Sequence, residues 1–397
     1  MLNRRDFIKL SSLTSFSSLP FVRTTFAKAE TEARYVVILL RGAMDGLAAV
    51  PAYGDQHYYS LRRTLALPSP NEENGILDLN GFFGLHPVMQ NMHNMYQNKE
   101  ALIFHSVASP YRQRSHFDAQ RLLQNGTNLP LGADNGWLYR ALQDFSGSHQ
   151  DAIALAQKLP LILYGSQQVN SWSPGGVNVN SNDIFDRVAR LYDDNVFFAR
   201  QLNAALETQA MVEQMTEQGN QLSRRNVNRL TPTLTAAAQF LSNPIGPRIA
   251  VLESTGWDTH ANQGSTHGRL ANNLRDLDEG LGALKGGLNE NWSNTVVTVV
   301  TEFGRTVAVN GTNGTDHGTA SAAFMLGGAI NGGQVKSEWP GLSKSNLHDG
   351  RDLAATLDVR SLFKSSLHHH LKISKRSLEE SVFPDSSAAP ILNDLIA

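Results

Sequence analysis

Short runs of apolar residues alternate along the chain with longer stretches that show helical spacing. The runs are apolar at nearly every position, which is typical of strands buried on both faces of a parallel sheet. They lie at residues 35–40 (YVVILL), 101–104 (ALIF), 248–252 (RIAVL), 295–301 (TVVTVVT) and 323–326 (AFML). Helical spacing covers residues 115–124, 136–145, 266–288 and 352–370. This alternation predicts an α/β fold with a mostly parallel central sheet and helices on both faces.

One long stretch departs from this alternation. Residues 183–243 are rich in Gln, Asn, Arg and Ala, and they show helical spacing without a strand candidate. We interpret them as a helical insertion or an outer helical layer. Residues 67–84 and 165–180 contain clusters of Pro, Gly, Asn and Ser and are expected to be loops.

The first thirty residues have the features of an export signal. Arg4 and Arg5 precede a mildly apolar, Ser-rich stretch, and residues 27–29 (AKA) offer a cleavage site with small residues. The order NRRDFIK is similar to the twin-arginine export signal, which is read by a receptor and is not an anchor. We therefore expect residues 1–29 to be a signal read by the twin-arginine export machinery, and residues 30–397 to form the α/β domain. The mature protein is then periplasmic or extracellular.

Composition narrows the range of partners and cofactors. The 397 residues carry a net charge of −2 and no long basic block, which argues against a nucleic-acid partner. Beyond the signal, no run approaches the roughly 20 apolar residues of a membrane span. The chain has no cysteine, so a metal would have to be held by Asp, Glu and His side chains.

Polar residues gather directly after the predicted strands. In an open parallel sheet, ligands bind beyond the carboxyl ends of the strands. Such ends carry Asp45 after the first run, Ser115-His116 after the second, Asp258 and His260 after the third, and Glu302 after the fourth; Asp316-His317 follows later. Several carboxylates and imidazoles are therefore expected on one edge of the sheet.

Each of these residues also has a local explanation. Ser115 is a good helix N-cap, and Asp45 before Gly46 fits a turn. Arg112 and Arg114 are either surface charges or ligands for an anionic substrate. Residues 368–370 (HHH) lie on a predicted late helix and are interpreted as a solvated tract.

Six stretches together resemble a bacterial domain-of-unknown-function family of twin-arginine-exported proteins. That family is grouped with the alkaline phosphatase and sulfatase superfamily. The resemblance extends over nearly the whole chain after the signal, and it implies an alkaline phosphatase-like core with two divalent metals and a Ser or Thr nucleophile at the strand ends. The stretches are LLRGAMDGLAAVPAY, RSHFDAQRLLQNG, TGWDTHANQ, VVTEFGRT and GTDHGTASAAFMLGGAINGG, in addition to the signal.

The resemblance implies roles for individual residues. Asp45 is similar to an aspartate that binds metal, and Ser115 lies where the superfamily's nucleophile begins a helix. Glu253 and Asp258 are similar to the acid pair that leads the second group of ligands. The superfamily tends to place a histidine four residues beyond that aspartate, whereas His260 is two beyond.

Two placements are open for the last motif. Read literally, Asp316-His317-Gly318 resembles the superfamily's Asp-His-Gly signature. That signature usually follows directly on a strand ending in Val-Thr, a place that Glu302 and Phe303 hold in this sequence. On this second placement, which we favour, Phe303 replaces a metal-binding histidine and His317 corresponds to a later single histidine. The site would then bind one ion, bind ions weakly, or bind none.

Three hypotheses follow. The first is an exported hydrolase of phosphate or sulfate esters that uses zinc, calcium, magnesium or manganese. In it Ser115 attacks the ester or positions water, Arg112 or Arg114 neutralises the anionic substrate, and the metal ligands are Asp45, Asp258, His260, Glu302, Asp316 and His317. The second is a non-catalytic exported binding or assembly protein with a degraded metal site. The third is a metal-free general acid–base enzyme that uses His116, His260 and His317.

Overall fold

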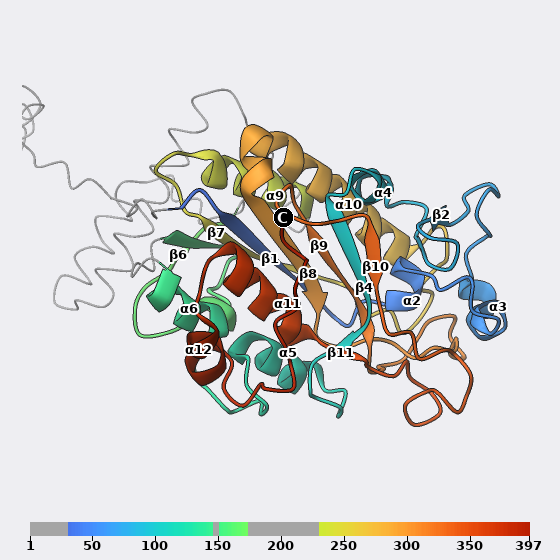
Figure 1. The fold of residues 1–397 in the computed structure, drawn as a ribbon. Helices are drawn as coiled ribbons and strands as arrows, with labels where there is room; N and C mark the ends of the chain where they lie inside the picture. The colour runs from blue at the N-terminus through green and yellow to red at the C-terminus, as the bar shows by residue number, and fades with distance from the viewer. Residues whose placement is uncertain (1–30, 146–150, 174–229) are drawn as a thin grey trace, which may run out of the picture.

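The computed structural model describes residues 31–145, 151–173 and 230–397 (Figure 1). The predicted export signal at 1–29 lies outside these residues, and so does the 183–229 part of the predicted helical insertion. The described end of that insertion is helix α9 (Leu230–Ser242). Within the described ranges, no helix has the length and apolar character that crossing a membrane requires.

The described chain is built around one nine-stranded sheet. Eight strands follow the order β10-β4-β9-β8-β1-β7-β5-β6, and β11 also pairs with β4. All these pairs are parallel except those of β9, which runs against both β4 and β8. The mostly parallel sheet predicted from the sequence is therefore confirmed. The strands are β1 (Arg34–Arg41), β4 (Ala101–Ala108), β5 (Ala152–Leu155), β6 (Asn170–Ser171), β7 (Ile249–Thr255), β8 (Thr295–Thr301), β9 (Ser321–Leu326), β10 (Gln334–Lys336) and β11 (Leu357–Asp358).

Helices cover both faces of the sheet (Figure 1). Successive residues of β1 point to opposite sides, so Val36 packs into one core and Val37 into the other. The first core contains residues of α4 (Gln90–Gln97), α9 and α10 (Arg269–Leu288). The second contains residues of α5 (His116–Asn125), α6 (Trp137–Phe145) and α11 (Val359–Ser365). Burial on both sides explains why the strand sequences are continuously apolar.

The reversed direction of β9 shapes the edge of the sheet where the other strands end. Because β9 is antiparallel to β8, its first residue lies near the end of β8 rather than near its beginning. The residues just before β9, including Asp316 and His317, therefore lie at the same edge as Glu302 after β8 and Asp258 after β7. This direction brings motifs that are far apart in the sequence to one place.

The predicted helix at 352–370 is shorter than expected. It begins only at Val359, where Asp358 caps it, and it continues into a π-helical turn at Ser366–His370. The interpretation of 368–370 as a solvated tract is wrong for His370, which is 9% exposed and whose Nε2 lies 3.0 Å from the carbonyl of Arg34 at the start of β1. The remaining short elements are α2 (Gly46–Ala49), α3 (Tyr58–Arg62), α12 (Lys375–Ser377) and the hairpin of β2 (Leu77–Asp78) and β3 (Gly84–Leu85).

Buried histidines outside the edge of the sheet make the fold sensitive to acid. Burial lowers the pKa of His86, His105 and His370 to about 4, although each ring contacts a backbone carbonyl. Above about pH 6.5, the pKa of the unfolded side chain, the imidazole is neutral in both the folded and the unfolded state, so its burial does not make stability depend on pH. As the pH falls below that value, these histidines become protonated in the unfolded chain but stay neutral in the folded chain. The free energy of unfolding therefore decreases as the pH falls, down to about pH 4. Each histidine is expected to contribute a loss of about 1–2 kcal/mol at pH 5.

Urea unfolding at pH 7 and pH 5 measures this loss. The matched variant is His105→Gln, because His105 is fully buried and its Nε2 lies 3.0 Å from the carbonyl of Val50. We expect the stability difference between the two pH values to be smaller in the variant than in the wild-type protein. An equal difference in both proteins would contradict a role for His105.

Candidate metal centre

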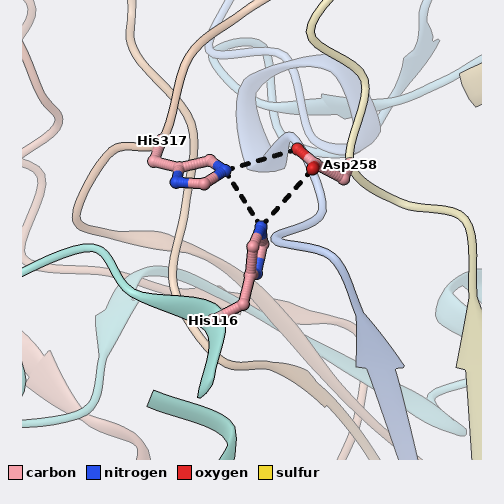
Figure 2. Close-up of side chains that lie close together, drawn as sticks. All are labelled: His116, Asp258 and His317. Atoms are coloured by element: carbon pink, nitrogen blue, oxygen red, sulfur yellow. Dashed lines mark hydrogen bonds and ion pairs between the residues drawn. The ribbon is translucent and has the colours of Figure 1, made fainter. Parts of the chain in front are cut away.

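Three side chains meet at the edge of the sheet where the parallel strands end: His116, Asp258 and His317 (Figure 2). Each offers one possible ligand atom, and these atoms all lie within 4.8 Å of one another. The Nε2 atoms of His116 and His317 are 2.9 Å apart. Asp258 places Oδ2 3.6 Å from Nε2 of His116 and Oδ1 3.4 Å from Nε2 of His317.

Each of the three residues comes from a different part of the sheet. His116 is the first residue of α5, which begins after β4 and is capped by Ser115. Asp258 follows β7, and its loop passes close to the end of β1. At that contact Gly42 has φ +122°, and a Cβ there would lie 2.5 Å from the backbone nitrogen of Asp258. Only glycine therefore allows the Asp258 loop to approach β1 so closely.

His260 lies beside this group and contacts two of its three members. Its Nε2 lies 3.0 Å from Nε2 of His317 and 3.0 Å from Oδ1 of Asp258. The sequence spacing of two between Asp258 and His260 predicts side chains on the same side of an extended segment, and the structure brings both to the same point. His260 is more open to solvent than the other two histidines, with 46% of its side chain exposed against 26%.

The second ring nitrogen of each histidine faces a hydrogen-bond acceptor. Nδ1 of His116 lies 2.7 Å from Oε1 of Glu302, and Nδ1 of His260 lies 3.2 Å from Oδ1 of Asp316. Nδ1 of His317 lies 3.0 Å from the backbone carbonyl of Arg114. A carboxylate or a carbonyl can only accept, so in each neutral ring the proton is on Nδ1 and the lone pair is on Nε2.

Three Nε2 lone pairs and a carboxylate therefore point at one another without a donor between them. Such a group is stable only when a cation lies among the ligand atoms, either a proton or a metal ion. Histidines that bind metals almost always donate their other N–H to a carboxylate or a carbonyl, as these three do. Tetrahedral zinc, with ligands at about 2.0–2.1 Å, holds its ligand atoms about 3.3 Å apart. The observed separations of 2.9–3.6 Å fit that geometry.

Glu302 lies behind His116 and not among the converging atoms. Its Oε1 accepts from the backbone N–H of Gly42 at 2.8 Å and from Nε2 of Gln120 at 2.9 Å, in addition to its contact with His116. Burial raises the pKa of Glu302, but the hydrogen bonds from His116 and Gln120 lower it by more, so the pKa is lowered overall. The same hydrogen bond, with the carboxylate charge, raises the pKa of His116. Glu302 thus holds the His116 ring in one orientation and one tautomer.

Arg305 has a corresponding relation to Asp258. Its Nη1 donates to Oδ1 of Asp258 at 2.6 Å, and its side chain is completely buried. Burial of Asp258 favours the neutral acid, but the hydrogen bond and charge of Arg305 lower its pKa overall. Burial and the neighbouring His116 lower the pKa of His317. The acid is therefore kept ionised and His317 is kept neutral, which are the forms that bind a metal.

Phe303 closes the apolar side of the group. It is 3% exposed, and its ring stacks on His116 with a centroid distance of 4.8 Å and an interplanar angle of 27°. Its centroid lies 5.2 Å from that of His317. Phe303 offers no ligand atom, so where the resemblance places a metal-binding histidine the chain has an aromatic ring that covers one side of the two imidazoles.

The structure does not bring Asp45 into the converging group. Its carboxylate caps α2, forms an ion pair with the fully buried Arg62, and accepts from Nε2 of Gln263 at 2.7 Å. Both side chains of the Asp45–Arg62 pair are almost completely buried. These contacts occupy both carboxylate oxygens, so the acid acts here as the partner of a buried arginine. Glu253, the other acid that the resemblance singles out, forms an ion pair with Arg41.

The remaining predicted residues surround the group. Ser115 accepts from the backbone N–H of Asp118 at 3.5 Å, a long capping bond that leaves its hydroxyl only weakly engaged. Arg112 is exposed and donates to the carbonyls of Ser109 and Tyr111. Arg114, expected to bind an anion, has its guanidinium held by Asp349 and Asp352 instead.

Sequence reasoning missed the supporting residues. Gln120 donates a hydrogen bond to Glu302, and Arg305 keeps Asp258 ionised through its charge and hydrogen bond. The carbonyl of Arg114 accepts from His317 and orients its ring. Arg305 stands in the EFGRT stretch directly after β8, so its place at the end of a strand was a usable signal. A backbone carbonyl leaves no signal in the sequence, because every residue has one.

A model of the family described as "Protein of unknown function (DUF1501)" matches residues 32–382. The chain belongs to this family. The family expected from the sequence motifs is thereby confirmed. No curated protein matches the chain in sequence.

Several solved structures are similar to the DUF1501 chain. A sulfatase from Pseudoalteromonas sp., PsFucS1, has 14% identity and a TM-score of 0.43, with 89% of this chain and 70% of that chain covered. The zinc complex of the C-terminal periplasmic domain of EcEptC from Escherichia coli has 12% identity and a TM-score of 0.42, with 91% and 89% covered. TAB5 alkaline phosphatase, as a mutant with Mg bound, has 12% identity and a TM-score of 0.37, with 77% and 94% covered. Similarity at this level says nothing about the chemistry of the present chain, which follows from its own residues.

Proposed function

We propose that this DUF1501 protein is a metal-dependent hydrolase of phosphate or sulfate esters that acts outside the cytoplasm after twin-arginine export. The observation that carries the proposal is the convergence of His116, Asp258 and His317, with Nε2 of His260 3.0 Å from both Asp258 and His317. His116, Asp258 and His317 would hold a divalent ion, and His260 would be the fourth ligand. The ligand set of imidazoles and a carboxylate suits zinc better than calcium or magnesium.

A divalent ion bound there would polarise the ester oxygen as a Lewis acid. The chain's own residues then bind and orient. Arg112 is exposed, and within the described ranges its guanidinium donates to backbone carbonyls and forms no ion pair, so its charge would neutralise the ester anion. Ser115, next to His116 at the N-terminus of α5, would supply the attacking hydroxyl or would position water. Phe303 and the aromatic contacts around His116 exclude water from one side.

A second function is favoured by Phe303 alone. The absence of a ligand atom at this position is consistent with a binding or assembly protein that keeps one ion as a structural or recognition element without turnover. This alternative and the hydrolase share the metal centre and differ only in catalysis.

Metal content and ester hydrolysis test the proposal together. The mature protein would be purified from a periplasmic fraction without chelator or affinity metal, and its metals would be determined by mass spectrometry. We expect about one equivalent of a divalent ion, as a single tetrahedral centre requires. We also expect hydrolysis of p-nitrophenyl phosphate or p-nitrophenyl sulfate that stops when the ion is removed and returns when it is restored.

Three outcomes distinguish the hydrolase, the binding protein and a protein without a metal centre. Metal with turnover supports the hydrolase. Metal without turnover of either ester class favours the binding protein. A well-folded protein that contains no metal and takes up none at micromolar zinc would overturn the metal centre itself.

A further inference from the structure

A buried carboxylate that the sequence motifs did not indicate lies behind His317. Asp352 is completely buried and sits between β10 and β11 in the chain, outside every stretch that carries the family resemblance. Its Oδ2 accepts from Nε of Arg114 at 2.8 Å and from the hydroxyl of Thr319 at 3.0 Å. Its Oδ1 lies 2.8 Å from Nε of Arg351. One carboxylate thus contacts two separate segments of the chain, at Arg114 and at Thr319, and its own sequence neighbour Arg351.

Two of those three residues, Arg114 and Arg351, also contact His317. The carbonyl of Arg114 accepts from Nδ1 of His317 at 3.0 Å, and Nη2 of Arg351 donates to the carbonyl of His317 at 2.6 Å. Thr319, the third partner of Asp352, is two residues from His317 in the same strand-entry segment. The three side-chain contacts of Asp352 therefore lead to the His317 segment, either directly or through one further hydrogen bond.

The backbone at Arg114 is held in an unusual conformation. Arg114 has φ +60°, in the left-handed region that residues other than glycine rarely adopt. Such a conformation costs of order 1–3 kcal/mol and persists only where the surroundings impose it. In this conformation the Arg114 side chain pairs with the buried carboxylate of Asp352, and the Arg114 carbonyl faces the His317 ring.

We propose that Asp352 is a positioning residue that, through Arg114 and Arg351, fixes the ring orientation and the Nδ1–H tautomer of His317. It touches neither the converging ligand atoms nor a substrate. Its effect is on the atom that His317 presents to the metal, because the carbonyl of Arg114 keeps the proton on Nδ1 and leaves Nε2 free. The inference rests on the proposed metal centre for its consequence, but the tautomer itself is a property of the metal-free chain.

The test compares two acids that bind the same arginine. Asp352→Asn removes the buried charge at one side of Arg114, whereas Asp349→Asn removes the partner on its other side, whose side chain is 60% exposed. Residues that orient a metal-binding histidine typically change metal affinity by about 10–100-fold. We expect Asp352→Asn to weaken zinc binding by about that factor and Asp349→Asn to change it less than about threefold, since exposed ion pairs contribute little. Zinc affinity would be measured by competition with a chromophoric chelator, with His317→Ala as the reference for background binding.

The tautomer is measured separately on metal-free protein. Nitrogen-15 NMR of the imidazoles, assigned with His317→Ala, should show His317 with its proton on Nδ1 in the wild type and in Asp349→Asn. In Asp352→Asn it should show a mixture of the two tautomers. A purely structural role for Asp352 would lower stability without moving this signal. An unchanged His317 tautomer and unchanged zinc affinity in folded Asp352→Asn would overturn the inference.

The outcomes also separate this inference from the proposed function. If wild-type protein binds no zinc, the metal centre fails, while the NMR result still decides the role of Asp352. If Asp352→Asn does not fold, Arg351→Met is the second variant. Arg351 is 42% exposed, so the variant should fold, and it removes the donor to the His317 carbonyl. It should weaken zinc binding about tenfold, and unchanged binding in this folded variant would count against the inference.

Discussion

Asp258→Asn is expected to reduce zinc affinity by more than about a hundredfold. A four-ligand zinc site contributes about 10–16 kcal/mol of binding free energy, so the loss of one ligand of four costs on the order of 3 kcal/mol. Asparagine keeps an oxygen to accept from Nη1 of Arg305, which is buried and would otherwise lose its partner. The change therefore removes the ligand charge with little other disturbance. Competition with a chelator, followed by metal analysis of the purified variant, measures the effect.

The matched control is Asp134→Asn, since the side chain of Asp134 is 97% exposed and its ion pair within the described ranges is with Arg121. Its zinc affinity should equal that of the wild type. A folded Asp258→Asn protein that retains wild-type affinity would show that the three histidines bind without the acid, and the ligand set proposed above would be wrong.

Asp45→Ala is expected to destabilise the fold by about 3–5 kcal/mol, the usual cost of leaving one partner of a buried ion pair alone. Arg62 is completely buried, and its other side-chain hydrogen bond among the described residues is to the carbonyl of Val307. Removing Asp45 leaves this guanidinium charge without a carboxylate and also removes the N-cap of α2. Guanidinium chloride unfolding of the wild type and the variant gives the difference.

The double variant Asp45→Leu with Arg62→Met is the informative control. Replacing both partners of a buried ion pair by apolar residues is often neutral or stabilising, so the double variant should recover most of the loss. The same proteins separate the two roles of Asp45. If Asp45 binds metal, as the family resemblance implies, the double variant would lose zinc affinity, whereas we expect zinc affinity near that of the wild type because Asp45 is occupied by Arg62 and Gln263.

The sequence pattern identified most of the residues at the candidate site but could not distinguish ligands from the acid behind them. His116, Asp258, His260 and His317 stand out because imidazoles and carboxylates at the ends of strands are unusual, and all four meet in the structure. Glu302 was equally conspicuous, yet it lies behind His116 as the acceptor of its Nδ1 proton. Residue type and place at a strand end are the same for a ligand and for the acid behind it. Only the direction of the side chain distinguishes the two.

The sequence alone determined the class of fold and the edge at which the polar residues gather. Continuous apolar runs such as 35–40 and 295–301 belong to strands buried on both faces, and that local property needs no knowledge of their neighbours. The tertiary structure decided which acids face the ligand group. The reversed direction of β9 brings His317 to His116, and buried arginines that are remote in sequence take up Asp45 and support Asp258. These choices depend on strand order and on pairing between distant charges, and neither leaves a periodic trace along the chain.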